Sequence, residues 1–465
     1  MKRLLIAACL LAPCAAGISG QAAAAEQQFP AVLAGQALLP ARTLVAPPAD
    51  AGPLFQSSGK FTAANRQRVE ALESLPATSF PSARDAPRVT DIRLPLPGQA
   101  VQGMSAVHPV GDGTFWLLTD NGFGGKLNST DALLMVHRVR PVFTTGTMEV
   151  LETIFLSDPD RKVPFAISQE NTQRRYLTGG DFDPESLRVI GDRLWIGEEF
   201  GPYLLEFTRD GRLVQLFETT VSGRTHRSPD HYALNQAPAV PGPAPAFDVR
   251  RSRGFEPMAA TPDGRFLYVA FEGPLWDAER GAWESVGAPG AERRVVRILE
   301  FSVAERRYTG RVMRYALHAP DHVLGDIAMI DATTAVLIER DDSTEGSRAE
   351  ACQGPAQPTC FNVPAAFKRV YKIDLSRVDA DGLVHVAGYI DLTDIADPDR
   401  RAHLGGTTGR FTMPHLGPEG VAVVDADTIA IVNDNNLPYS MGRRIGRADD
   451  NELVLLRVPE LLRAR

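Results

Sequence analysis

The stretch that decides the fold is Asp183–Gly201, which reads DPESLRVIGDRLWIGEEFG. Two short apolar runs flank a Gly-Asp turn, with Glu185 before the first run and Glu199 after the second. Short apolar runs joined by such a turn are typical of a β-hairpin. The stretch therefore predicts two antiparallel strands with both acids at the same end.

The same pattern recurs along the chain: a polar residue, an apolar run, a turn, a second apolar run and an acid. The two polar residues of each copy are 13 to 16 positions apart, in the pairs Ser105 and Asp120, Glu185 and Glu199, Glu256 and Glu272, Asp326 and Glu339, and Glu419 and Asp434. Most copies continue into two further strands. Four-stranded antiparallel units repeated in this way are typical of a β-propeller. We predict an all-β chain, a propeller with five readable blades, or six if a degenerate segment forms another.

The N-terminal part of the mature chain is predicted to complete the ring. The last copy has only three evident strands, and Arg88–Leu96 (RVTDIRLPL) is expected to supply the missing outer strand. Residues 26–87 are rich in Ala and Pro, with one helix expected at about Ala63–Leu75. We predict that they form an arm on a propeller domain of residues 88–465.

Residues 1–25 have the pattern of a secretory signal peptide: Lys2 and Arg3, a short apolar run, and small residues ending at Ala25. No later stretch has the length of an apolar membrane span. The mature protein is therefore predicted to be periplasmic or secreted, monomeric and without a membrane span. In an oxidising compartment, Cys352 and Cys360 are expected to form a local disulfide.

The charge balance restricts the class of partner. The chain has 49 basic and 57 acidic residues, a formal net charge of −8. An acidic surface without a basic stripe argues against nucleic-acid partners. It is compatible with binding a cation.

The repeated acids are expected to converge, because the start of the first strand and the end of the second lie at the same end of a hairpin. Carboxylates that converge repel one another, and a divalent cation relieves that repulsion. Ligands that are all oxygen favour Ca²⁺. The predicted metal ligands are Glu185, Glu256, Asp326, Glu419 and Asp434. The alternative is that each acid caps a turn or accepts backbone N–H bonds.

Several of these stretches resemble the phytase-like family, which is described as having esterase-like activity of phytase. They include GGDFDPESL, EEFGPYLLEF, SRGFEPMAATPDGRFLYVAFEGPL, GDIAMID, VLIERDD and GPEGVAVVDADTIAIVNDNN. The resemblance runs from about Gln102 to Leu456. It implies a secreted or periplasmic propeller that hydrolyses phosphate or other esters.

We therefore predict a metal-dependent hydrolase of small anionic esters, with phosphoesters such as phytate favoured. A ring carboxylate, Glu256 or Glu199, is the candidate general base, and Arg253 and Arg340 are candidates for holding the substrate anion. Serine chemistry is not favoured, because the sequence contains no G-x-S-x-G motif. The alternative is a non-catalytic propeller that binds a ligand or partner around a structural Ca²⁺, since a fold does not determine a function.

Overall fold

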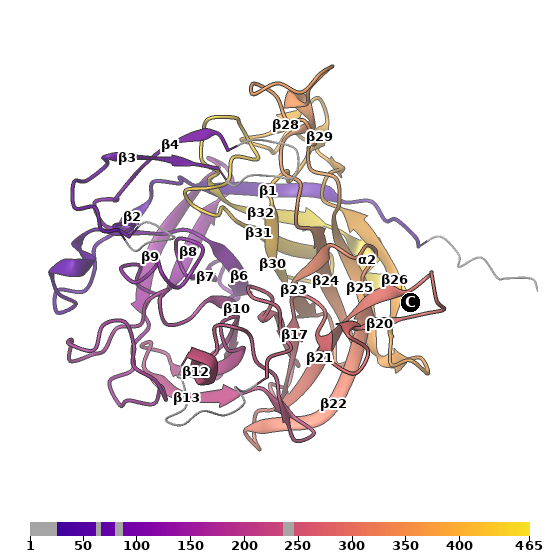
Figure 1. The fold of residues 1–465 in the computed structure, drawn as a ribbon. Helices are drawn as coiled ribbons and strands as arrows, with labels where there is room; N and C mark the ends of the chain where they lie inside the picture. Colours follow the sequence, from indigo (N-terminus) through magenta and orange to yellow (C-terminus); the bar gives the residue numbers. More distant parts are fainter. Residues whose placement is uncertain (1–25, 62–66, 80–86, 236–245) are drawn as a thin grey trace, which may run out of the picture.

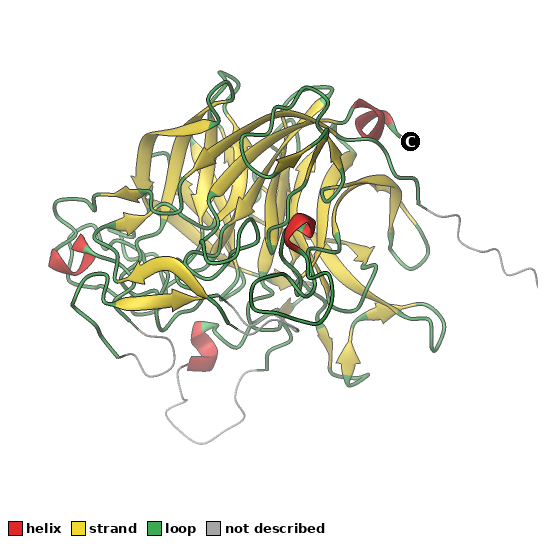
Figure 2. Cartoon of the chain, turned by 90° about the horizontal axis from the view of Figure 1, so that it is seen from above, coloured by secondary structure: helices red, strands yellow, loops and turns green. Residues whose placement is uncertain are grey.

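The computed structural model describes residues 26–61, 67–79, 87–235 and 246–465 (Figure 1). This part of the chain is built almost entirely of β-strands (Figure 2), so the all-β prediction is confirmed. Its α-helices are two short ones, α1 (Tyr232–Asn235) and α2 (Pro459–Arg463). None of the helices described has the length and hydropathy that crossing a bilayer requires. The predicted signal peptide lies outside the described residues.

Most strands belong to antiparallel groups of four that follow one another along the chain. The first two groups contain β6 (Met104–Pro109), β7 (Phe115–Thr119), β8 (Met135–Val142) and β9 (Thr147–Phe155), then β10 (Pro184–Ile190), β11 (Arg193–Glu198), β12 (Tyr203–Thr208) and β13 (Leu213–Glu218). The next two contain β16 (Phe255–Ala260), β17 (Phe266–Phe271), β21 (Arg293–Ser302) and β22 (Arg307–Ala316), then β23 (His322–Met329), β24 (Thr334–Asp341), β25 (Lys368–Val378) and β26 (Val384–Asp391). The last contains β30 (Gly417–Val423), β31 (Thr428–Asp434), β32 (Asn451–Arg457) and β1 (Val32–Leu39).

The first strand of each group faces the middle of the molecule. β6 contacts β10, and the contacts continue through β16, β23 and β30 back to β6. The outer strands, such as β9, β13, β22 and β26, lie at the periphery (Figure 1). This radial arrangement is compatible with a propeller.

The strand that completes the last group is β1, which pairs antiparallel with β32 from Val32–Arg457 to Leu39–Asn451. The prediction that Arg88–Leu96 supplies this strand is wrong. Residues Val89–Leu94 form β4, which pairs with β3 (Leu75–Thr78). β1 is longer and more apolar than β4, and Ala37 and Leu39 are buried in the core.

The helix predicted at Ala63–Leu75 is also wrong in its described part. Residues 67–74 form bridges and turns, and residues 62–66 lie outside the description. Glu73 has a φ of 52°, in the left-handed region, which an α-helix of L-residues does not contain.

Short strand pairs and turns are added to the five strand groups. They include β2 (Leu44–Val45) with β5 (Gln99–Ala100), β14 (Thr220–Val221) with β15 (Arg224–Thr225), β18 (Trp276–Asp277) with β19 (Ala282–Trp283), β20 (Ser285–Val286) beside β21, and β27 (Ile395–Ala396) and β28 (Gly406–Thr407) on either side of β29 (Arg410–Phe411). Two 3-10 turns, η1 (Pro53–Gln56) and η2 (Arg348–Glu350), complete the description.

Apolar side chains fill the space between neighbouring groups. Trp195 of the second group packs against Phe217 and Phe301, with ring centroids 6.0 and 5.7 Å away. The same core cluster continues through the third group to Tyr371 of the fourth. Packing of this kind fixes each group against its neighbours and so fixes the ends of the strands, where polar residues stand.

The long segment after β24 contains the disulfide predicted from sequence. Cys352 and Cys360 are bonded, with Cα atoms 4.9 Å apart.

Candidate active site

β-Bulges in the first strands explain why the repeat places acids in the middle of the molecule. In all five hairpins the register between the first and second strand shifts, between Met104 and Ala106, Pro184 and Ser186, Phe255 and Met258, Leu324 and Ile327, and Pro418 and Gly420. The residues skipped include the first polar residue of every copy. A bulge leaves its extra residue out of the ladder and re-aims its side chain. The side chains of these acids therefore do not follow the alternating up-and-down pattern of the strand.

The bulges open onto a cavity of about 160 Å³ at one end of the central strands. Nine carboxylates line it: Asp120, Asp183, Glu185, Glu199, Glu256, Glu272, Asp342, Glu419 and Asp434. Two guanidiniums, those of Arg253 and Arg340, stand among them. We call this the carboxylate cavity.

Most of the predicted site residues meet in this cavity. Four of the five predicted ligands, Glu185, Glu256, Glu419 and Asp434, line it and are buried. The exception is Asp326, whose two carboxylate oxygens each accept a hydrogen bond from Arg188 Nη2 at 2.8 Å. Asp326 is thus part of a buried ion pair and lies apart from the other predicted ligands.

The fourth group also differs at the second position of the repeat. Glu339 is turned away from the cavity, and its carboxylate accepts from Tyr315 Oη at 2.7 Å and contacts the imidazoles of His318 and His322. Successive side chains of a strand point to opposite faces. The next residue, Arg340, therefore enters the cavity in place of an acid.

Sequence reasoning left Asp183 and Asp342 out of the predicted site. Asp183 lies just before β10, and the bulge at Glu185 breaks the alternation, so the period of the strand gave no signal for it. Asp342 directly follows β24, two positions after Arg340, and there the period was a signal that both face the same side. Neither belongs to the repeated pair of polar residues, which is why the repeat did not indicate them.

Two other acids of the deciding stretch have structural roles. Glu198 accepts hydrogen bonds from the backbone N–H groups of Phe200, Gly201 and Tyr203, at 2.7 to 2.9 Å. Asp181 likewise accepts from the backbone and side chains of Ser168 and Thr178. Glu198 and Asp181 therefore match the alternative expectation, in which an acid caps a turn or accepts backbone N–H bonds.

Burial and mutual repulsion raise the pKa values in the cavity. Burial, reinforced by the charges of neighbouring acids, holds the pKa of Glu185, Glu199 and Glu256 well above its usual range. The same two causes raise the pKa of Asp120 to about 7. For Glu419 burial is again the main cause and Arg340 acts against it, leaving a pKa of about 7. Such crowded carboxylates cannot all be ionised without a compensating charge.

The family model described as "Phytase-like: Esterase-like activity of phytase" matches residues 99–437. The chain belongs to the phytase-like family. The predicted resemblance is thereby confirmed, and the match includes every residue that lines the carboxylate cavity. No curated protein matches the sequence significantly.

Solved structures resemble this phytase-like protein only weakly. The periplasmic gluconolactonase PpgL of Pseudomonas aeruginosa is 12% identical, with a TM-score of 0.31, over 83% of this chain and 99% of the other. The hydrazine synthase of Kuenenia stuttgartiensis is 11% identical, with a TM-score of 0.28, over 72% of this chain and 78% of the other. Scores this low carry no argument about activity.

The two arginines of the phytase-like protein partly neutralise the cavity. Arg340 donates to Glu419 and Asp342, both at 2.8 Å, and to Glu272 at 3.2 Å. Arg253 donates to Glu272 at 2.6 Å and to Asp342. Two guanidiniums are too few to neutralise nine carboxylates, so the remaining acids need protons or a bound cation.

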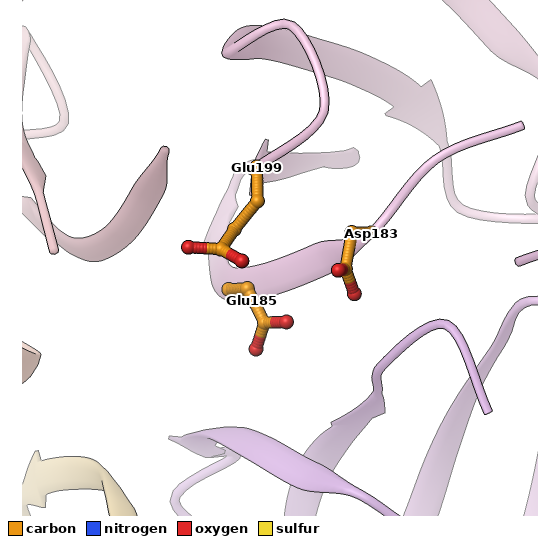
Figure 3. A group of neighbouring side chains, drawn as sticks. All are labelled: Asp183, Glu185 and Glu199. Carbon is orange, nitrogen blue, oxygen red and sulfur yellow. The ribbon is translucent and has the colours of Figure 1, made fainter. Parts of the chain in front are cut away.

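The donor set fits a divalent cation. Two groups of buried acids, Asp183–Glu185–Glu199 and Glu199–Glu256–Glu272, each bring one oxygen per residue within 4.8 Å of the others. The carboxylates of the first group gather around a common space (Figure 3). Glu256 Oε1 is buried and accepts no hydrogen bond from the described residues; a cationic neighbour, Arg340 Nη2, lies 3.6 Å away. A buried carboxylate oxygen without a hydrogen bond is costly, and a cation held nearby lowers that cost.

Proposed function

We propose that this phytase-like protein is a cation-dependent ester hydrolase, with Ca²⁺ as the cation and phosphoesters such as phytate as the favoured substrates. The observation that carries the proposal is the cluster of buried carboxylates around Glu256 Oε1, which accepts no hydrogen bond within the described part of the chain. Ca²⁺ binds a variable number of ligands, all of them oxygen, and carboxylates can supply these ligands. Family membership supports ester hydrolysis as the chemistry.

The proposed ligands come from the acids that share the cavity. They are Asp183, Glu185, Glu199, Glu272, Glu419 and Asp434, with Glu256 beside them in the same cluster. Asp326 is not included, because its carboxylate holds Arg188. When bound, the cation supplies polarisation of the phosphoryl or carbonyl oxygen of the ester.

Glu256 is proposed as the general base, with Glu199 as the second candidate. Water attacks the phosphorus atom, its proton passes to Glu256 Oε1, and the bond from phosphorus to the alcohol oxygen breaks. The alcohol oxygen then takes up a proton from the same carboxyl group or from water. Arg253 stands at the edge of the cavity, where its guanidinium can hold the anionic ester.

The finer features of the fold are part of the same proposal. We interpret the five strand groups as five propeller blades within residues 88–465, with β1 reaching the last blade from the arm of residues 26–87. We also propose that the protein acts as a monomer in the periplasm or outside the cell, where the Cys352–Cys360 disulfide persists.

Hydrolysis of three compounds tests the proposal: phytate, a simple aryl phosphate and a short-chain aryl ester. Each is incubated with the purified protein in calcium and in excess chelator. The E256Q/E419Q variant is compared with E305Q, a change at an exposed acid that pairs with Arg307. We expect calcium-dependent release that falls at least about a hundredfold in E256Q/E419Q and is retained in E305Q.

A different result favours a binding protein. If none of the compounds is hydrolysed while chelator lowers the melting temperature, the cation is structural. The protein is then a non-catalytic propeller that binds a ligand or a partner. If release continues in chelator, the cation-dependent mechanism is wrong.

A further inference from the structure

Another cavity, which we call the apolar cavity, lies at the opposite end of the central strands from the carboxylate cavity. Its volume is about 390 Å³, within the range of about 300–1,000 Å³ that is usual for small-molecule sites. The carboxylate cavity is lined where the first strands of the groups begin, and the apolar cavity is lined where the same strands end. The two cavities are therefore different places on the molecule.

The buried ion pair of Arg188 with Asp326 lies between the two ends. Both carboxylate oxygens of Asp326 accept from Arg188 Nη2 at 2.8 Å. The same carboxylate accepts from the backbone N–H groups of Met258, at 3.3 Å, and Val421, at 3.2 Å. These bonds connect β10, β16, β23 and β30. They separate a molecule in the apolar cavity from the acids at the other end.

Apolar side chains surround the apolar cavity. The last residue of each of the five first strands lines it: Pro109, Ile190, Ala260, Met329 and Val423. Each of these residues is only partly buried. Covering such a ring of apolar surface removes it from water, which is favourable. The cavity thus presents apolar surface that a ligand can bury.

The charged side chains that line the apolar cavity already have partners of opposite charge. Arg188 is paired with Asp326, and Asp263 Oδ2 accepts from Arg265 Nε at 2.8 Å. The hydroxyl group of Thr261, which also lines the cavity, donates to Asp263 at 2.7 Å. The lining therefore offers no unpaired charge to a ligand, which favours an uncharged molecule over an ion.

His108 supplies a hydrogen-bonding group that the protein does not use. Its side chain lines the cavity, and neither ring nitrogen has a hydrogen-bond partner among the described residues. Burial, together with the charges of Arg188 and Arg209, lowers the pKa of His108 to about 3. The imidazole is then uncharged at neutral pH, with one nitrogen free to accept a hydrogen bond and the other to donate one. A ligand that donates to the accepting nitrogen would satisfy it.

We propose that the apolar cavity binds an uncharged, mainly apolar small molecule that carries one hydroxyl or amine group. The ring of apolar residues contacts its carbon skeleton, and His108 accepts a hydrogen bond from its polar group. A few well-placed polar groups in an apolar lining are the usual composition of a small-molecule site. The proposal does not depend on ester hydrolysis, because no residue of the carboxylate cavity takes part.

Binding of an uncharged fluorescent probe tests the cavity. N-phenyl-1-naphthylamine has two aromatic units joined by one N–H group, and its fluorescence rises in apolar surroundings. A260W fills the cavity with an indole, whereas V378W adds the same side chain at an exposed valine outside it. We expect one probe to bind per chain, at least about tenfold more weakly in A260W and less than about twofold more weakly in V378W. No saturable binding to the unchanged protein, or equal affinities in the two variants, would overturn the proposal.

A second probe tests the role of His108. In 1-benzylnaphthalene a CH₂ group replaces the N–H group, and its affinity is measured by displacement of the fluorescent probe. The unchanged protein should prefer the N–H probe about fivefold, as one hydrogen bond predicts, and H108L should bind both probes without that preference. Equal affinities for the two probes in the unchanged protein would contradict the proposed ligand class. E256Q/E419Q should bind both probes as the unchanged protein does, whatever its effect on hydrolysis, because its changes lie at the other end of the strands.

Discussion

The hairpins β10–β11 and β23–β24 have nearly the same sequence pattern and use their acids in opposite ways. In β10–β11, Glu185 and Glu199 enter the carboxylate cavity without a basic partner at hydrogen-bonding distance. In β23–β24, Asp326 pairs with Arg188 and Glu339 contacts two histidines. The pattern thus places an acid, but its neighbours decide whether it is neutralised by the protein or left for a ligand. The pKa values follow the same division, because burial raises that of Glu199 while His318 and His322 overcome burial and lower that of Glu339 to about 2.

The largest expected effect comes from breaking the buried pair of the fourth group. D326A leaves the guanidinium of Arg188 buried and unpaired, so the free energy of unfolding should fall by about 3–5 kcal/mol. E185Q removes one of several repelling carboxylates, and in chelator it should leave that free energy unchanged or raise it. Urea unfolding of both variants checks the contrast. Equal losses would mean that the two hairpins use their acids alike.

The pH dependence of the free energy of unfolding tests the same comparison at Glu339, the second polar residue of its hairpin. Because the pKa of Glu339 is lowered to about 2, its contribution is present above pH 4.5 and is lost as the pH falls from 4.5 toward 2. The loss should be about 3 kcal/mol, and E339Q should lose a similar amount already at pH 7. Urea unfolding between pH 7 and 3 should show about 2 kcal/mol of this loss. A parallel decline in E339Q would show that other groups are responsible.

Arg340 is the residue of β24 that extends from the fourth strand group into the carboxylate cavity. R340Q removes a positive charge beside Glu256, Glu272 and Glu419, so calcium should bind about tenfold more tightly. Calorimetric titration with calcium gives the dissociation constant, with R307Q as the control. Weaker calcium binding in R340Q would place the cation elsewhere.

The smallest effect is expected in the first group, where Ser105 occupies the bulge that carries an acid in the other groups. Among the described residues, its hydroxyl makes only a long hydrogen bond, 3.4 Å, to the backbone oxygen of Gly103. S105A should change the free energy of unfolding by less than about 1 kcal/mol and the calcium dissociation constant by less than about twofold. A tenfold loss of calcium affinity would instead make the hydroxyl a ligand.

The repeat made the strand groups and the convergence of most acids predictable from the sequence. What it could not indicate was the long-range pairing of β1 with β32, since Val32–Leu39 and Val89–Leu94 both read as strands and only tertiary packing chooses between them. Nor could it separate Asp326 from Glu185, because Arg188 lies in another strand group and becomes a partner only after folding.

The pairing of β1 with β32 also sets the order of events during biosynthesis. β1 leaves the ribosome among the first strands, yet its partner is among the last to be made. The ring therefore cannot close until translation is almost complete, and a nascent chain keeps an unpaired strand until then.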